Sequence, residues 1–416
     1  MTYKDTPLGK MPDTWGIAKI KDIAKVVTDY VANGSFASLA ENVTYRSEED
    51  IAVLIRLVDY NNDFKGDFVF IDEHAYEFLS KSKLFGGEII ISNVGANVGT
   101  VFRCPVLKYK MSLAPNAIMV QFNGNDSFYY HWFKGHYGQK MLKSIVTGSA
   151  QPKFNKTNFK DMLVPVPPIE VQNKIASLLD AIELKIAQNT AINENLEQQS
   201  QALFKAWFVD FEPFGGIMPD DWSECILDSM CSLIIKGITP KYIEHSAQFV
   251  INQKCVRNHQ IDLSLARCHE PKKVNEKWLQ YGDIVVNSTG TGTLGRAAQV
   301  LFTPNNMTVD SHVTIIRASK QEYIYYLGLW ATSHEHDFEM LQTGSTGQTD
   351  LPRERLKQMP VILPSDDILC KFSEIIKPIA DIRIKNQQEN QSLAALRDTL
   401  LPKLMNGEID VSAVKI

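Results

Sequence analysis

Two long heptad segments decide the fold of this chain of 416 residues. Residues 169–208 read IEVQNKIASLLDAIELKIAQNTAINENLEQQSQALFKAWF, and residues 366–405 read DDILCKFSEIIKPIADIRIKNQQENQSLAALRDTLLPKLM. In each segment a seam residue recurs every seven positions, and the third of five is asparagine. Such a seam predicts a coiled-coil helix whose register is set by the asparagine. The seam residues are Ile175, Ile182, Asn189, Leu196 and Leu203 in the first segment, and Phe372, Ile379, Asn386, Leu393 and Leu400 in the second.

The sequence around these segments repeats as well, which predicts a duplicated module. Residues 87–92 match residues 282–287, and each is a short β-rich run that ends at a glycine-rich turn. Helices are expected over 127–145 and 321–341. We therefore expect an α+β protein in which an antiparallel coiled coil of two long helices separates two repeated mixed α/β domains with pseudo-twofold symmetry. The expected boundaries are 1–166 for the first domain, 167–208 for the first long helix, 209–364 for the second domain, 365–405 for the second long helix and 406–416 for a C-terminal tail.

The repeat relation also predicts how the two helices pair. In an antiparallel pair with a central pseudo-dyad, Asn189 should lie near Asn386, and Asn193 and Asn390 should flank them. The alternative is that each helix packs only on its own domain. Pro378 falls inside the second heptad segment, where it predicts a kink or a late start of that helix.

Composition and terminal sequence indicate a cytoplasmic protein. Hydrophobic residues make up 44% of the chain and charged residues 22%, which is ordinary for a globular protein of two or more domains. No apolar run reaches the length of a membrane span, and the first residues lack the apolar core of an export signal. The six cysteines form no metal-binding spacing, so free thiols in a reducing compartment are expected.

Charge is distributed unevenly, although the net charge of −5 alone argues mildly against nucleic acid. Residues 81–160 contain eleven Lys and Arg against two acidic residues, whereas residues 1–80 contain eight against fourteen. A cluster of one sign predicts a site for a polyanion. A solvated basic face without a partner remains the alternative.

Two motifs resemble catalytic ones. Gly290–Gly295 with Asp310 has the form of a dinucleotide fingerprint, which requires a helix to begin at the third glycine. Residues 296–302 predict a strand instead, so a nucleotide-dependent enzyme built on 283–310 is a minor alternative. Asp180 and Glu183 resemble a nuclease carboxylate cluster, but a solvated face of the heptad helix is the favoured interpretation. The histidines predict no metal site.

Residues suited to DNA recur in both halves. Lysine and arginine can contact phosphates, whereas glutamine and asparagine can contact adenine edges. Their recurrence at equivalent places, more than any single residue, predicts DNA binding. The candidates are Asn97, Lys108, Lys110, Gln151, Lys153, Lys156 and Lys160 in the first half, and Lys272, Lys273, Arg296, Gln348, Arg353 and Arg355 in the second.

The strings that end the two helices, residues 202–213 (ALFKAWFVDFEP) and 400–410 (LLPKLMNGEID), resemble the specificity (S) subunits of type I restriction–modification systems. The resemblance covers essentially the whole chain. It implies a non-catalytic subunit that binds a bipartite target in double-stranded DNA and no membrane. It also implies two methyltransferase subunits and a translocase–nuclease restriction subunit as partners, with the methyl donor and ATP on those partners and no cofactor on this chain. The alternatives are a specificity subunit with a fused nuclease–methylase partner, and a coiled-coil adaptor without DNA binding.

Overall fold

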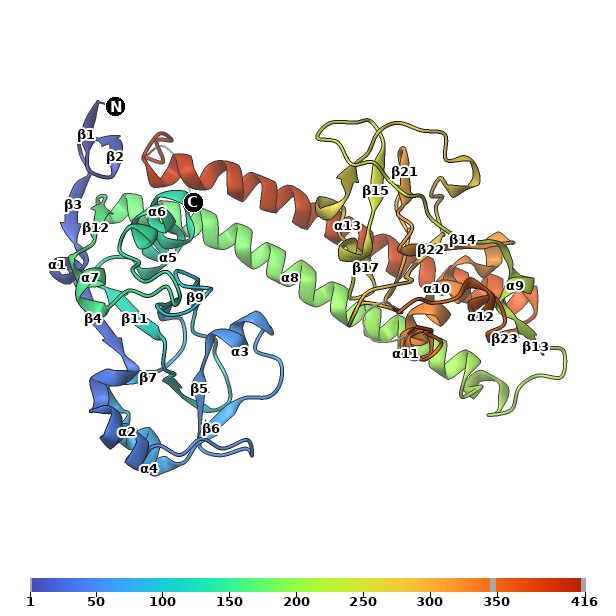
Figure 1. Cartoon of the computed structure of the whole chain (residues 1–416), viewed down its shortest axis with the longest axis horizontal. Coiled ribbons are helices and arrows are strands. Elements are labelled where there is room, and N and C mark those ends of the chain that lie inside the picture. The colour runs from blue at the N-terminus through green and yellow to red at the C-terminus, as the bar shows by residue number, and fades with distance from the viewer. Residues whose placement is uncertain (1, 345–348, 413–416) are drawn as a thin grey trace. The chain divides into compact units, whose positions relative to one another are not determined.

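The computed structural model describes residues 2–344 and 349–412. The chain divides into two compact units, the first comprising Met1–Ile186 and Gln391–Ile416 and the second Ala187–Asn390. Each unit holds one globule and a part of each long helix, α8 (Ile169–Phe208) and α13 (Asp366–Met405) (Figure 1). We call residues 2–166 globule 1 and residues 209–364 globule 2.

Globule 1 is built on a four-stranded antiparallel sheet in the order β4-β11-β8-β9. A second sheet has the order β6-β5-β10-β7, in which β5 and β10 are parallel, and β3 pairs with β12. The strands are β1 (Tyr3–Thr6), β2 (Gly9–Pro12), β3 (Gly16–Lys19), β4 (Ala24–Asp29), β5 (Ala52–Ile55), β6 (Val69–Ile71), β7 (Lys83–Leu84), β8 (Ile89–Ser92), β9 (Val101–Arg103), β10 (Lys110–Leu113), β11 (Ala117–Phe122) and β12 (Leu163–Val166). The helices are α1 (Ile20–Ile23), α2 (Phe36–Asn42), α3 (Leu57–Asn61), α4 (Glu73–Phe78), α5 (Asp126–Lys134), α6 (His136–Ser144) and α7 (Lys156–Asp161).

Globule 2 repeats this plan. Its main antiparallel sheet has the order β14-β22-β19-β20, its second sheet the order β18-β15-β21 with β15 and β21 parallel, and β13 pairs with β23. The matching strand orders confirm the duplication predicted from the sequence. The strands are β13 (Ser223–Ile226), β14 (Cys231–Lys236), β15 (Phe249–Ile251), β16 (Val256–Arg257), β17 (Gln260–Ile261), β18 (Arg267–Cys268), β19 (Ile284–Asn287), β20 (Ala297–Gln299), β21 (Met307–Val309), β22 (Val313–Ala318) and β23 (Pro360–Leu363), and the helices are α9 (Leu227–Met230), α10 (Ile324–Ser333), α11 (Glu335–Met340) and α12 (Arg353–Lys357).

The apolar run before each glycine-rich turn is a central strand with both faces covered. Ile89 and Ile91 join the core cluster that includes residues of α5 and α8, whereas Ile90 joins the cluster between the two sheets of globule 1. Successive side chains on a strand point to opposite faces, so a strand buried on both sides is apolar at every position. β19 follows the same rule, with Ile284 and Val286 in one cluster and Val285 in another.

The helices expected over 127–145 and 321–341 are each divided in two. The first is α5 and α6, which meet at Gly135, and the second is mainly α10 and α11, which meet at His334. At Gly138 in α6, an added Cβ would lie 2.2 Å from the carbonyl oxygen of Trp132. The tight packing of α6 against the end of α5 therefore requires glycine there, and a single straight helix is wrong.

The two long helices run antiparallel where they meet in the second unit. Asn189 Nδ2 donates to Asn390 Oδ1 at 3.0 Å, Asn386 Nδ2 donates to Asn193 Oδ1 at 2.9 Å, and the rings of Trp207 and Phe372 are 5.6 Å apart. The pairing differs by one helical turn from the expected pairing of Asn189 with Asn386. Residues four positions apart lie on the same face of a helix. Asn189 therefore contacts Asn390 instead of Asn386, and Asn386 contacts Asn193 instead of Asn189.

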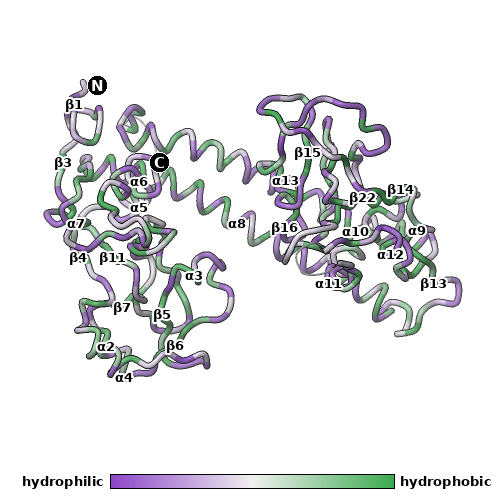
Figure 2. The backbone as a smooth tube through the Cα atoms, viewed as in Figure 1, coloured by the Kyte–Doolittle hydropathy of each residue, from purple (hydrophilic) through white to green (hydrophobic). Residues whose placement is uncertain are grey.

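The seam is largely buried along both helices. Figure 2 shows hydrophobic and hydrophilic residues alternating along α8 and α13, as amphipathic helices require. In the first unit, Ile175 and Leu179 of α8 share a core cluster with Leu404 and Met405 of α13. All ten seam residues are buried or half-buried. The seam residues with the lowest exposure are Phe372, Ile175, Asn189 and Ile182.

Pro378 does not interrupt α13, which is one helix from Asp366 to Met405. The expected late start is therefore wrong. Proline has no N–H, so the carbonyl oxygen of Glu374 receives no helical hydrogen bond from position 378. Because Pro378 is exposed, this carbonyl lies on the solvent side of the helix. In the described part of the chain, no helix is both long enough and apolar enough to span a membrane.

Candidate nucleic-acid interface

Three loops meet at one end of the main sheet of globule 1. They are the glycine-rich turn after β8 (93–99), the turn between β10 and β11 (114–116) and the loop before α7 (147–153). The N–H of Asn93 donates to the oxygen of Asn116 at 3.1 Å, and the N–H of Phe154 donates to the oxygen of Asn93 at 3.0 Å. The loop 147–153 is closed by a pair of hydrogen bonds between Thr147 and Lys153 at 2.8 and 2.9 Å. We call this arrangement junction 1.

Globule 2 contains the same arrangement, junction 2, made of residues 288–295, 310–312, 343–344 and 349–351. The N–H of Ser288 donates to the oxygen of His312 at 2.8 Å, and the N–H of Leu351 donates to the oxygen of Ser288 at 2.8 Å. Thr343 and Asp350 exchange a pair of hydrogen bonds at 2.8 and 2.9 Å. The backbone scaffold of the two junctions is therefore the same, while the side chains on it differ.

The glycine-rich turn of junction 2 does not open a helix. Residues 297–299 form β20, which pairs with β19, so the strand expected over 296–302 is confirmed. Gly295 has a φ of +88°, and a Cβ there would meet the backbone of Glu335 at 2.6 Å. This glycine allows close packing against α11, and the turn lacks the helix N-terminus that a dinucleotide site requires.

The basic cluster seen in the sequence is largely neutralised in the structure. Lys108, two residues before β10, pairs with Glu49 at 3.2 Å, and Lys110, the first residue of β10, pairs with Glu73 at 2.9 Å. Both lysines lie at the end of β10 opposite to the turn of junction 1. The acidic residues of segment 1–80 thus offset the lysines of segment 81–160. Lysines without an acidic partner among the described residues flank the loop of junction 1, and they are Lys140, Lys143, Lys153 and Lys160.

Four of the predicted residues of the first half gather at junction 1. Asn97 is exposed in the glycine-rich turn, and Gln151 and Lys153 are exposed in the loop. Lys156 begins α7 and pairs with Asp29 at 2.8 Å. Lys160 is half-buried at the end of α7. The fold thus brings together residues up to 59 positions apart that could contact one stretch of DNA.

The predicted residues of the second half are more dispersed. Arg296 ends the glycine-rich turn and donates to the oxygen of Gly292 at 2.8 Å, while Arg353 begins α12 beside junction 2. Arg355 donates to the oxygen of Leu341 at 3.2 Å. Lys272 and Lys273 are exposed after β18, where Lys272 donates to the oxygen of Thr239. Gln348 lies outside the described residues.

The strand end beside each junction carries an acidic residue in globule 1 and a basic residue in globule 2. In globule 1, Asp29 at the end of β4 pairs with Lys156 at 2.8 Å. In globule 2 the equivalent strand end carries Lys236, which pairs with Asp350 at 2.5 Å. Asp29 is paired with Ile118 of β11, and Lys236 is paired with Thr314 of β22. Ile118 and Thr314 are each the second residue of their strand, so Asp29 and Lys236 hold equivalent positions. One scaffold therefore presents opposite local charge patterns.

Sequence reasoning missed the residues at the centre of each junction. Asn116 follows Pro115 in a two-residue exposed turn and has a φ of +68°, and His312 holds the equivalent position in globule 2. The Pro-Asn pair between two apolar runs was the available signal for a turn. Its closeness to the glycine-rich turn depends on the order of strands in the sheet, which the sequence does not state.

In the first unit, a polar cluster fastens globule 1 to α8. Asp180 accepts hydrogen bonds from Arg103 at 2.7 Å, from Ser127 at 2.5 Å and from His131 Nε2 at 2.8 Å. Burial alone would raise the pKa of Asp180, but these hydrogen bonds outweigh it and hold that pKa far below its usual value. The expected solvated helix face is therefore wrong at this position.

The same cluster is the group of potential metal ligands found among the described residues. His131, Asp180 and Glu183 place ligand atoms within 4.8 Å of one another. Asp180 already pairs with Arg103, and Glu183 pairs with Lys134 at 3.2 Å. Because cationic side chains occupy both carboxylates, the group serves to hold the helix and does not form a ready site for a metal ion.

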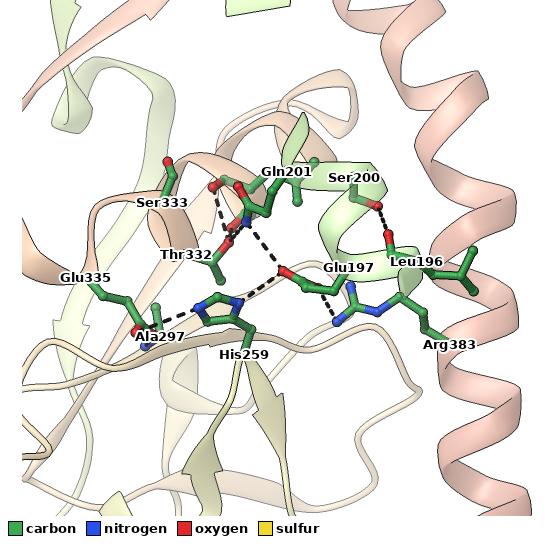
Figure 3. A network of polar contacts seen from close by, with 12 residues as sticks. Leu196, Glu197, Ser200, Gln201, His259, Ala297, Thr332, Ser333, Glu335 and Arg383 are labelled. Atoms are coloured by element: carbon green, nitrogen blue, oxygen red, sulfur yellow. Dashed lines mark hydrogen bonds and ion pairs between the residues drawn. The ribbon is translucent and has the colours of Figure 1, made fainter. Parts of the chain in front are cut away.

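In the second unit, a corresponding network fastens globule 2 to α8 (Figure 3). His259 occupies the tip of the β16–β17 hairpin, where Asn258 and His259 have φ values of +48° and +57°. Its Nδ1 lies 3.0 Å from Glu197 of α8 and its Nε2 lies 3.7 Å from Glu335 of α11. Glu197 also pairs with Arg383 of α13. The hairpin is thus held against both long helices and α11.

Electrostatics keep this histidine charged. Burial alone would lower the pKa of His259, but hydrogen bonds to Glu197 and Glu335 raise it to about 9. The imidazolium and the Arg383 guanidinium together balance the two carboxylates, so the network is close to neutral at physiological pH.

With this geometry established, the chain can be compared with known proteins. Residues 12–198 match the family model described as the type I restriction modification DNA specificity domain. The chain is 25% identical, over 98% of its own length and 96% of the relative's, to the MjaIX specificity subunit of a type I restriction enzyme from Methanocaldococcus jannaschii. The chain is similar to type I specificity subunits over nearly its whole length.

Further relatives agree with this family. The HindI specificity subunit from Haemophilus influenzae is 24% identical over 65% of this chain and 74% of the relative. The crystal structure of the S subunit of a type I system from M. genitalium covers 96% of this chain and 99% of its own with a TM-score of 0.60 at 15% identity. The fold of two α+β domains with long coiled-coil helices is therefore the fold of type I specificity subunits.

Proposed function

We propose that this chain is the DNA-recognition subunit of a type I restriction–modification complex and that each globule binds one half of a bipartite, asymmetric target. The observation that carries the proposal is the repeated junction, in which one backbone scaffold displays different side chains in the two globules. Equivalent scaffolds favour a shared mode of DNA binding. Different side chains favour different base sequences in the two half-sites, and hence an asymmetric target.

The distribution of charge supports contact with DNA at junction 1. Lysines without acidic partners lie in the loop 147–153 and in the two helices beside it, where phosphates could replace water around them. Such contacts release counterions and make affinity fall steeply with salt concentration. Exposed amides in the same loops, such as those of Asn97 and Gln151, are suited to base edges.

The long helices support a role in assembly. Apolar side chains are exposed on α8 at Leu184 and Ile192, and on α13 at Ile382 and Leu396, with exposed fractions between 47% and 59%. Such residues fit contacts with partner proteins. We propose two methyltransferase subunits and a restriction subunit as the partners, with the methyl donor and ATP bound by them and with no catalytic step on this chain.

Methylation-aware sequencing tests the proposal. The chain is expressed with the methyltransferase and restriction subunits of its own system in a host that lacks adenine methylation. We expect methylated adenines in one asymmetric motif of two specified parts separated by unspecified bases. Expression of the partners without this chain is the control and should leave the genome unmethylated. Methylation with no motif, or methylation that persists without the chain, would refute the proposal.

A further inference from the structure

The two junctions differ most clearly at one pair of equivalent positions, Asn116 and His312. Both residues are exposed in the turn that precedes the long central strand, β11 or β22. In both, the backbone oxygen accepts a hydrogen bond from the first residue after β8 or β19. The backbone at this point is fixed by the sheet, so the side chain is the part that is free to vary.

In globule 2, a relay of hydrogen bonds orients the exposed imidazole. The Gln253 amide nitrogen donates to the backbone oxygen of Thr289, which can only accept, so the orientation of that amide is determined. The same nitrogen donates to Thr289 Oγ1 at 2.5 Å. The hydroxyl is then free to donate its own proton to His312 Nδ1, which lies 2.9 Å away.

With the Thr289 hydroxyl donating to Nδ1, the ring proton of His312 lies on Nε2. No hydrogen-bond partner for Nε2 occurs in the described parts of the chain, and the side chain is exposed. Globule 2 therefore presents a positioned N–H donor. A donor of this kind selects a base edge that offers acceptors, and guanine offers two in the major groove, N7 and O6.

In globule 1, the same position presents an amide. The Asn116 side chain makes no hydrogen bond with the described residues, and the neighbouring position of the glycine-rich turn is Val94 where globule 2 has Thr289. An apolar valine cannot form the relay seen in globule 2, so Asn116 keeps both its donor and its acceptor. An asparagine amide matches the N6–H donor and N7 acceptor of adenine.

We propose that Asn116 and His312 are equivalent specificity-determining residues that recognise adenine in the first half-site and guanine in the second. The inference rests on the proposed function, since it assumes that both junctions contact DNA. It goes further by assigning one base in each half-site to one side chain. It also predicts that His312→Asn alone moves the preference of the second half-site to adenine, because an asparagine amide does not depend on the relay, whereas the reverse exchange in globule 1 also needs a hydroxyl in place of Val94.

The test selects bound duplexes from a randomised pool with the full chain in complex with its methyltransferase partners. Asn116→His, combined with Val94→Thr to supply the relay hydroxyl, should change an adenine of the first half-site to guanine, with an enrichment of about tenfold or more, and leave the second half-site unaltered. His312→Asn should cause the opposite change in the second half-site only. A histidine tolerates the left-handed backbone at position 116, so the first variant is expected to fold.

Asn123→His is the matched control. Asn123 is also exposed and immediately follows β11, at the end of the strand opposite to Asn116. The control should keep the unaltered motif. If both junction variants bind DNA with the unaltered motif, the assignment of bases is overturned while the proposed function stands. If the unaltered chain in its complex selects no motif at all, the proposed function itself fails.

Discussion

The network around His259 makes the stability of the second unit depend on pH in a defined way. A rise in the pKa of His259 from 6.5 to about 9 corresponds to about 3 kcal/mol of stabilisation of the folded state. Because the folded pKa lies above the unfolded one, this contribution is complete below about pH 6.5 and is lost as the pH rises through about 9. His259→Gln removes the charge while keeping a polar side chain.

The measurement is urea unfolding of the unaltered chain and of the variant at pH 6, 7.5 and 9.5. We expect the difference in the free energy of unfolding to be about 3 kcal/mol at pH 6, about 2 kcal/mol at pH 7.5 and close to zero at pH 9.5. Subtraction removes the titration of the lysines, tyrosines and cysteines, which both proteins share. Arg383 also faces Glu197 and is charged throughout this range, so it does not alter the trend.

His245→Gln is the control, because His245 is exposed in the same globule. Hydrogen exchange at the β16–β17 hairpin should rise in His259→Gln and stay unchanged in the control. A destabilisation of His259→Gln that does not vary between pH 6 and pH 9.5 would refute the argument that the imidazolium holds the hairpin against Glu197 and Glu335.

Two further predictions concern the DNA-binding surface and the core. Lys153→Ala should weaken binding to all DNA sequences alike and lower the slope of affinity against salt concentration by about one. Lys108→Ala is the control: it loses only its pair with Glu49 and should change neither the affinity nor the slope. Titration of DNA at several salt concentrations measures both variants. Phe372→Ala should destabilise the second unit by about 3–5 kcal/mol, since Phe372 is fully buried against Trp207. Thermal unfolding measures the loss of stability, with Ile382→Ala at an exposed position of the same helix as the control. A loss of stability equal to that of Ile382→Ala would contradict the packing.

Much of the fold could be predicted because its signals are local and repeated. The heptads gave both long helices, and the runs before the glycine-rich turns gave β8 and β19. The failures came where tertiary contacts override the local pattern. The break at Gly135 depends on packing against Trp132, and the continuity of α13 through Pro378 depends on which side of the helix faces solvent.

The candidate site was predicted less well than the fold. The loop with Gln151 and Lys153 was found from its composition. Asn116 and His312 were not, because their place in the junctions depends on strand order. Lys108 and Lys110 looked like phosphate ligands in the sequence, but each pairs with a glutamate tens of residues away.

By itself, the sequence determined that this protein is a duplicated α+β module with two long amphipathic helices. It could do so because periodicity and internal repetition are properties of neighbouring residues. Only the tertiary structure decided which charges are neutralised and which side chains share a junction. Ion pairs such as that of Lys156 with Asp29 join residues 127 positions apart, and their formation depends on how the sheet brings distant loops to one edge.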